Sequence, residues 1–263
     1  MLNMDFSIYK KYFSNFSSSG FSFDRSLVNG IKEFISTNGE KIKVLDFGCG
    51  MKPFSKYFSN CEEYIGVDIY RGKVVDVVYD GVKLPFPDNS FDLIISSSVL
   101  EHVEDINACI SEANRVLKPN GKFLSVVPFI NHVHGSPYDF RRPTRYGWEK
   151  LFKPYFKKIK IQSVDSRWQC VFNMLTASIN NSIYFILRKI NNYFKNNQEQ
   201  IKPLISDGGA SYETKNKLKV LYFIMNLNPI NFIIGIISLF FIRPPNTDFE
   251  GEFTSGYLIS AQK

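Results

Sequence analysis

The stretch that decides the fold runs from Ile42 to Gly50 and reads IKVLDFGCG. Its apolar run is typical of a buried parallel strand, and the glycines at its end let the backbone turn sharply and approach a ligand closely. A second apolar run ends at Asp68 in the sequence GVDI. An acid at the end of the second strand is placed to accept hydrogen bonds from a ribose diol. Together, the two strand ends indicate a site for a cofactor that contains a nucleoside.

Position 53 narrows the choice of cofactor. The dinucleotide fingerprint needs a third glycine there, where a helix packs closely on its strand beneath a pyrophosphate, but this chain has Pro53. NAD and FAD are therefore disfavoured. Proline instead suits the first turn of a helix, because its missing amide hydrogen has no partner there anyway. The pattern favours a cofactor that has a ribose but no phosphate.

Four blocks of sequence, in a fixed order, resemble the class I S-adenosylmethionine (SAM) dependent methyltransferases. The blocks are VLDFGCG at 44–50, GVDI at 66–69, DGVKLPFPDNSFDLIISSSVLEHV at 80–103 and RVLKPNGKFLSVVPF at 115–129. The resemblance covers about 41–151 and resumes at the carboxyl terminus. It implies an α/β fold with a Rossmann-like, doubly wound, mostly parallel sheet of seven strands and an antiparallel last strand.

The same resemblance implies a role for each residue that matches a motif. The turn around Asp46 would line the methionine end of SAM, Asp68 would hold the ribose hydroxyls, and Asp80 would accept from the adenine amino group. Ser98 and His102 would border the methyl group. Two alternatives stay open: Asp80 as a turn or cap residue, and Asp46 as a structural cap of the glycine turn. The full set implied to bind the cofactor is Asp46, Gly48, Cys49, Gly50, Asp68, Ile69, Asp80, Gly81, Leu84 and Ser98.

The acceptor is expected to meet the segment NHVHGSPYDFRRPTRYGW at 131–148, which follows the fifth predicted strand. Open α/β sheets bind their ligands at the carboxyl edge, where this segment emerges. The segment resembles a loop of methyltransferases associated with bacterial polysaccharide and glycan biosynthesis. Arg141 and Pro143 depart from that loop, which more usually has aromatic residues there. The matching residues are His134, Pro137, Asp139, Phe140, Arg142 and Thr144.

Methylation of a sugar hydroxyl would benefit from a base, and a histidine can serve near neutral pH. We favour His134 as this base, with His102 as the second candidate. The alternative for His102 is a helix residue packed against the sheet beside Glu101. The spacing of His132 and His134 is a poor signal for a metal, and none is expected. The residues predicted to bind the acceptor are Asp139, Arg142 and Arg145, of which both arginines could equally be solvated surface cations.

Composition agrees with a folded enzyme. The 263 residues are 44% hydrophobic and 16% aromatic, which is far from the composition of a disordered chain. The formal charge of +7 favours an acidic partner, such as a nucleotide-linked sugar, an anionic glycan, nucleic acid or a membrane surface. The four cysteines have neither CxxC spacing nor the clustering of a disulfide framework or zinc site. The start, MLNMDFSIYKKYF, lacks the apolar core of a secretory signal, so we expect a cytoplasmic protein.

The pattern along the chain predicts four parts. These are a helical lid at 1–40, a SAM-binding core at 41–167, a helical hydrophobic insertion at 168–245 and a final core strand at 246–263. Helices are expected between the strands, which gives an alternating βα order. The expected strands lie near 42–47, 63–68, 74–79, 91–97, 121–128, 157–165 and 253–263.

The insertion contains a long uncharged run at 220–242, flanked by lysines and Arg243. It is long enough to cross a bilayer, but Asn226 and Pro229 interrupt it, and a single crossing would place the final strand on the wrong side. Three readings remain open: helices packed on the core or on a second subunit, a patch resting on the membrane surface, and a hairpin with 171–190. If the helices pack on a second subunit, the protein is a homodimer. If the run rests on the membrane surface, the protein makes peripheral contact with the inner face of the membrane.

The sequence therefore predicts a SAM-dependent methyltransferase, of EC class 2.1.1, that methylates an oxygen of a sugar, a glycan or a lipid-linked saccharide. An anionic or lipid-linked acceptor is the expected partner, and no DNA partner is expected. Two alternatives remain. One is a methyltransferase that acts on RNA or another small molecule, although the chain lacks an arginine-rich tail. The other is a non-catalytic SAM-binding scaffold of a membrane complex.

Overall fold

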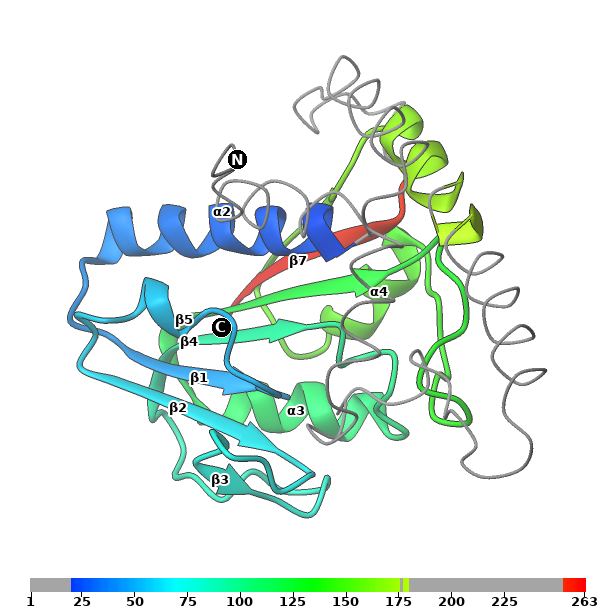
Figure 1. Cartoon of the computed structure of the whole chain (residues 1–263). Coiled ribbons are helices and arrows are strands. Elements are labelled where there is room, and N and C mark those ends of the chain that lie inside the picture. The colour runs from blue at the N-terminus through cyan, green and yellow to red at the C-terminus, as the bar shows by residue number, and fades with distance from the viewer. Residues whose placement is uncertain (1–19, 176, 180–252) are drawn as a thin grey trace, which may run out of the picture.

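A sheet of seven strands runs through the centre of the protein, in the order β3-β2-β1-β4-β5-β7-β6 (Figure 1). The structure is a computed structural model and describes residues 20–175, 177–179 and 253–263. Strand β7 is antiparallel to both of its neighbours, and the other pairs are parallel. The predicted Rossmann-like sheet with an antiparallel last strand is confirmed. Its strands are β1 (Lys43–Phe47), β2 (Glu63–Asp68), β3 (Val77–Val78), β4 (Phe91–Ser97), β5 (Leu117–Pro128), β6 (Lys158–Ser163) and β7 (Gly256–Gln262).

Helices cover both faces of this sheet. Helix α2 (Gly20–Asn38) lies along one face, while α3 (Ile106–Val116) and α4 (Arg145–Phe152) contribute to a single hydrophobic cluster on the other (Figure 1). Successive residues of a strand point to opposite faces, and β1 shows the result. Leu45 and Phe47 belong to the cluster of α3, whereas Val44 belongs to the cluster of α2. A strand buried on both faces explains the unbroken apolar run that marks β1 in the sequence.

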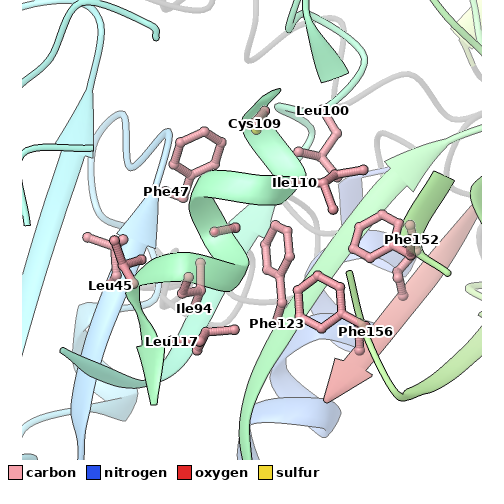
Figure 2. Packing of buried hydrophobic residues seen from close by; sticks show 14 of the residues in the cluster. Leu45, Phe47, Ile94, Leu100, Cys109, Ile110, Leu117, Phe123, Phe152 and Phe156 are labelled. Atoms are coloured by element: carbon pink, nitrogen blue, oxygen red, sulfur yellow. The ribbon is translucent and has the colours of Figure 1, made fainter. Parts of the chain in front are cut away.

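The cluster beneath α3 is rich in aromatic side chains (Figure 2). Phe123 of β5 lies against Phe152 of α4 with 5.8 Å between ring centroids, and Phe156 lies 5.5 Å from Phe152. Ile110 of α3 is completely buried in the same cluster. Burial of each such side chain stabilises the fold by roughly 1.5–3 kcal/mol. This packing holds β4 and β5 in place, and the candidate site lies at their carboxyl ends.

Helix α2 packs on the sheet through one apolar stripe. Phe23, Leu27, Ile31 and Phe34 recur at helical spacing and are all buried. Residues 20–38 of the predicted lid thus form a helix that belongs to the core packing. Residues 1–19 lie outside the part of the chain that the structure describes, so the lid role stays a prediction.

The connections differ from the expected alternation of strands and helices. The segment after β1 contains a single short 3-10 helix, η1 (Ser55–Tyr57), and the links 69–76 and 79–90 contain no α-helix. The expectation that Pro53 opens an α-helix is therefore wrong. Lys52 has a left-handed φ of 53°. The right-handed helical region is disfavoured for a residue that precedes proline, so the chain makes a turn here instead of starting an α-helix.

Most of the predicted insertion at 168–245 lies outside the described residues. Residues 167–175 and 177–179 are helical, and the description resumes at 253. The run at 220–242, with its membrane and dimer readings, is therefore among the positions left undescribed. Among the helices that the structure does describe, none combines the length and apolar character needed to cross a membrane.

Candidate active site at the carboxyl edge of the sheet

The glycine turn after β1 is held tightly against its neighbours. Gly48 and Gly50 have φ values of 69° and 48°, a region that favours glycine. The Gly48 amide donates to the Val67 carbonyl of β2 at 2.9 Å. A Cβ on Gly48 would lie only 2.4 Å from a methyl carbon of Val99, so no larger residue fits there unchanged. The turn therefore brings β1, β2 and the segment after β4 together.

Asp68, the predicted ribose acid, joins the end of β2 to this turn. Its Oδ2 accepts from the Gly50 amide at 3.0 Å, and its Oδ1 accepts from the Tyr70 amide at 3.1 Å. Each carboxylate oxygen can accept a second hydrogen bond. Asp68 thus has capacity left for a pair of hydroxyl donors. Ile69, the next residue, is half exposed beside it.

Asp80 shapes the turn that the third sequence block begins. Its Oδ1 accepts from the amides of Val82 at 2.8 Å and Lys83 at 3.0 Å, and these bonds lower the pKa of the carboxyl. A Cβ on Gly81 would lie 3.7 Å from Ile69, which places this turn beside the end of β2. The turn role is thus observed, and the adenine contact stays a prediction. Leu84, the predicted cover of the adenine ring, is buried.

Asp46 and Cys49 are buried beside β2. The Asp46 carboxylate accepts a hydrogen bond from the Tyr64 hydroxyl, and burial raises the pKa of Asp46 to about 6. The Cys49 sulfur packs against Gly66, and burial raises the pKa of its thiol to about 12. Both side chains therefore have partners within the fold, and their contact with a cofactor stays a prediction. Ser98 directly follows β4 and has a φ of 53°.

The two predicted bases meet around one buried carboxylate. Glu101 lies in the turn after β4 and has no exposed surface. His134 Nε2 lies 3.4 Å from Glu101 Oε1, and His102 Nε2 lies 3.7 Å from the same atom. Among the residues that the structure describes, neither Glu101 oxygen accepts a hydrogen bond of regular geometry. The carboxylate raises the pKa of His134.

Backbone carbonyls orient both imidazole rings. His102 Nδ1 lies 2.7 Å from the Tyr138 carbonyl oxygen, and His134 Nδ1 lies 3.2 Å from the His132 carbonyl oxygen. A carbonyl can only accept, so His102 Nδ1 carries the hydrogen and donates it. His134 Nδ1 also lies 3.4 Å from the Arg142 guanidinium, which can only donate, so its two contacts call for opposite tautomers. When the hydrogen is on Nδ1, each neutral ring presents the lone pair of Nε2 next to Glu101.

The predicted acceptor residues Asp139 and Arg142 pair with each other. The Arg142 guanidinium binds both oxygens of Asp139, whose side chain is only 2% exposed. Burial of Asp139 opposes ionisation, but the pair with Arg142 and the amide of His134, which donates at 2.9 Å, lower the pKa of Asp139 overall. The pair thus orders the loop that carries His134. Arg145 instead begins α4 and lies 4.9 Å from the ring centre of Tyr146.

Sequence reasoning missed the importance of two residues. Glu101 appeared only as a neighbour of His102, yet it stands between both histidines. Arg141 appeared only as a departure from an aromatic pattern. Its guanidinium donates to the carbonyl of Leu100 at 3.0 Å and of Glu104 at 2.8 Å, and also to that of Val103, so it fixes the turn that holds Glu101. The sequence did offer one signal for Arg141, since a charged residue stands where an aromatic one is usual.

Part of the chain that forms this edge of the sheet is similar to a known protein family. Residues 45–125 match the model of a family described as a methyltransferase domain. Over these residues the chain is similar to methyltransferase domains. The matched region contains the glycine turn, Asp68 and the segment that carries Glu101 and His102. The match ends within β5, so the loop of His134 lies beyond it.

Two curated proteins are similar to part of this chain. One is the uncharacterized protein MJ0638 of Methanocaldococcus jannaschii, 34% identical over 129 residues, which are 47% of this chain and 55% of MJ0638. The other is the uncharacterized methyltransferase YcgJ of Bacillus subtilis, 32% identical over 142 residues, which are 42% of this chain and 54% of YcgJ. The chain thus spans about half the length of these relatives.

A solved structure shows the same fold over a longer stretch. The [4+2]-cyclase SpnF is 15% identical, covers 89% of this chain and 80% of its own, and gives a TM-score of 0.50. At that identity the likeness concerns the fold alone. A cyclase on this fold also illustrates that function depends on the site rather than on the architecture.

SAM is the cofactor that a methyltransferase domain indicates, and the residues at this edge fit it. Ribose hydroxyls and an adenine amino group are donors, and the carboxylates of Asp68 and Asp80 are acceptors. A Cβ on Gly50 would meet nothing within 4 Å, so the turn leaves open space beside the Asp68 carboxylate that it binds. The donor chemistry of SAM therefore matches the acceptors in this region.

Proposed function

We propose that the protein is a SAM-dependent methyltransferase that methylates a hydroxyl oxygen of a sugar, a glycan or a lipid-linked saccharide. One relationship carries the proposal. The glycine turn contacts Asp68 on one side and Val99 on the other, and the chain beyond Val99 leads directly to Glu101 and His102. A cofactor held by Asp68 and a base beside Glu101 would thus share one edge of the sheet.

Bound SAM would supply a methyl group on a sulfonium, already activated for displacement. The work left to the protein is mainly alignment, which can contribute about 7–11 kcal/mol. A positioned base typically adds ~10²- to 10⁴-fold in rate. The fixed turns around Gly48 and Asp68 suit the first task. The oriented histidines suit the second.

His134 is the proposed acceptor of the hydroxyl proton. In the tautomer whose Nδ1 hydrogen is directed to the His132 carbonyl, the neutral ring has its lone pair on Nε2. The Asp139–Arg142 pair fixes the backbone of His134. Since Glu101 raises the pKa of His134, the neutral base should form at a somewhat higher pH than in a free histidine. The proton taken from the hydroxyl would then be stabilised by the Glu101 carboxylate.

The saccharide part of the proposal is supported by the loop at 131–148 and by its surroundings. The loop keeps the glycan-type pattern noted in the sequence. Tyr138 and Phe140 from the same loop are 59% and 44% exposed, and their ring centroids are 6.4 Å apart. Aromatic side chains offer a large apolar face, and tyrosine adds a polar tip, which suits the mixed surface of a sugar ring. Cytoplasmic location, membrane contact and dimerisation remain predictions from sequence.

Calorimetric titration tests the cofactor half of the proposal. SAM and its demethylated product would be titrated into wild type, Asp68→Ala and the control Asp88→Ala, whose exposed carboxylate pairs with Arg115. We expect Asp68→Ala to weaken binding by about 2 kcal/mol or more, because a charged acceptor is lost, and Asp88→Ala to bind normally. Absence of binding to folded, ligand-free wild type would overturn the proposal.

Transfer of labelled methyl groups tests the acceptor half. Saccharides, lipid-linked saccharides, RNA and apolar small molecules would be offered in parallel. Label in the saccharide fractions supports the proposal. Label in RNA or in another small molecule would replace it with that acceptor. Tight binding of SAM without transfer to any acceptor would favour a scaffold.

A further inference from the structure

The Glu101 carboxylate is a buried charge in need of a positive partner. It has no exposed surface, and in the described part of the chain no group donates a regular hydrogen bond to either oxygen. Burial of an ionised carboxylate is costly unless it is paired or bound to a metal. The Nε2 atoms of His102 and His134 lie 3.7 and 3.4 Å from its Oε1. In the tautomers that carry the hydrogen on Nδ1, both Nε2 atoms present lone pairs, so three electron-rich atoms converge on one point.

The spacing of these atoms suits a small cation. The three ligand atoms all lie within 4.8 Å of one another, and the two contacts to Glu101 Oε1 are 3.7 and 3.4 Å. Metal–ligand distances of about 2.0–2.2 Å in a tetrahedral zinc site place neighbouring ligand atoms roughly 3.4 Å apart. Contraction of the longest separation by at most about 1.4 Å would therefore bring all three atoms to coordination distance. The His102 and His134 side chains are 27% and 25% exposed, so one side of the cluster faces solvent.

The surroundings have the features of a metal site as well. Ligating histidines usually donate their other ring hydrogen to a carbonyl or carboxylate, which fixes the ring and its tautomer. His102 donates to the Tyr138 carbonyl. His134 Nδ1 lies 3.2 Å from the His132 carbonyl oxygen, 3.6 Å from Asp139 Oδ2 and 3.4 Å from the Arg142 guanidinium, and it can donate to either oxygen when it carries the hydrogen. The Asp139 carboxylate is itself held by Arg142.

We propose that Glu101, His102 and His134 bind one divalent transition-metal ion, with zinc as the first candidate. Two histidines and one carboxylate are an established ligand set for zinc and leave a coordination position open. The sequence spacing of His132 and His134 gave no sign of this site. Only His134 belongs to it, and the other two ligands come from the turn after a different strand. The inference goes beyond the proposed function, because binding of the ion requires neither SAM nor an acceptor.

The ion would also have a use if the proposed function holds. A hydroxyl oxygen bound at the open position would release its proton to solvent more readily, since a bound metal lowers the pKa of its oxygen ligand. His134 would then act as a ligand in place of a base. The activation would be provided by the charge of the ion.

Metal titration of the full chain provides the test. Protein freed of metal by a chelator would be titrated with Zn²⁺ by calorimetry, and with Co²⁺ by absorption spectroscopy. We expect one ion per chain and cobalt d–d bands without the charge-transfer absorption of thiolate ligands. Glu101→Gln and His134→Gln should each weaken zinc binding at least about 10-fold. The control is His132→Gln, which removes the third histidine of the chain and should bind zinc as wild type does.

The outcomes separate the two proposals. SAM affinity measured on the same samples reports whether each variant is folded and whether the cofactor site is intact. Zinc binding that is absent from folded wild type, or unchanged in both Glu101→Gln and His134→Gln, overturns the metal site and leaves a protonated His134 as the partner of Glu101. Zinc binding without any SAM binding would support the metal site while the proposed function fails.

Discussion

The ring of His102 lies edge-on to the ring of His134, with 4.9 Å between the centroids, although one residue follows β4 and the other follows β5. Gly135 makes this approach feasible. Its φ is 64°, and a Cβ built there would lie 3.0 Å from His102 Cε1. The glycine therefore leaves room for the second ring at the point where the loop turns.

Gly135→Ala should displace His102 while leaving SAM binding intact. The ring must shift by a few tenths of an ångström, and a misplacement near 1 Å can cost ~10²-fold in rate, so we expect kcat to fall by up to about 10-fold. Gly39→Ala is a matched control, because Gly39 also has a positive φ, of 79°, but a Cβ there meets nothing within 4 Å. Equal effects of the two substitutions on methyl transfer would show that backbone strain alone is responsible.

The two neighbouring histidines of the loop should differ sharply in importance. We expect His134→Ala to reduce methyl transfer by ~10²- to 10⁴-fold, because it removes the group that faces Glu101. His132→Ala should have a small effect, since His132 acts on this cluster through its backbone carbonyl, which the substitution keeps. The wild-type rate should rise with pH above the usual histidine pKa of about 6.5, since Glu101 raises the pKa of His134. A flat profile with unchanged activity in His134→Ala would remove the residue from the reaction.

Gly48→Ala should weaken SAM binding through a clash with Val99. The added Cβ would lie 2.4 and 2.8 Å from the two methyl carbons of Val99, so either the turn or the segment after β4 must shift. Val99→Ala removes those methyl groups. In calorimetry, we expect the double variant to bind SAM more tightly than Gly48→Ala alone, although the positive φ of Gly48 still costs something. Strictly additive losses would contradict this coupling.

Asp46 should make stability depend on pH. Burial raises the pKa of Asp46 from its ordinary value of 3.8 to about 6, so the folded state favours the protonated carboxyl. The resulting stabilisation is present below about pH 4 and is lost as the pH rises through about 6, by on the order of 3 kcal/mol. In urea unfolding without cofactor, Asp46→Asn should therefore exceed wild type in stability at about pH 8 and match it at about pH 4. A difference independent of pH would contradict the assignment.

Local sequence predicted much of the sheet but less of its connections. The runs at Val44 and Leu93 are buried on both faces, so their apolar character identified β1 and β4 directly. The link after β1 was mispredicted because its conformation depends on the left-handed Lys52, whose side chain pairs with Asp76 from a distant part of the chain. Propensity alone does not register such a tertiary contact.

The candidate site was predictable to a similar degree. Asp68 and the glycines were identifiable because they stand at or just after the end of a strand, and parallel strands end at a shared edge. The role of Glu101 was not, because it depends on two loops that meet only after folding. The pairing of Asp139 with Arg142 likewise follows from the turn between them, whose geometry no single residue dictates. Clusters of side chains from different loops are therefore the part of the site that is hardest to predict from the sequence.

The place of β7 between β5 and β6 has a consequence for biosynthesis. A ribosome that has completed β6 has not yet made the strand that joins it to β5, because residues 256–262 follow much later. Until these residues emerge, β5 is an edge strand whose unpaired amides and carbonyls can pair with a neighbouring chain. A nascent protein with such an open margin is prone to aggregate and is a natural client for chaperones. A premature stop ahead of residue 256 would thus remove the seven-residue strand β7, which lies between two other strands, and would leave the edge strand β6 without its partner.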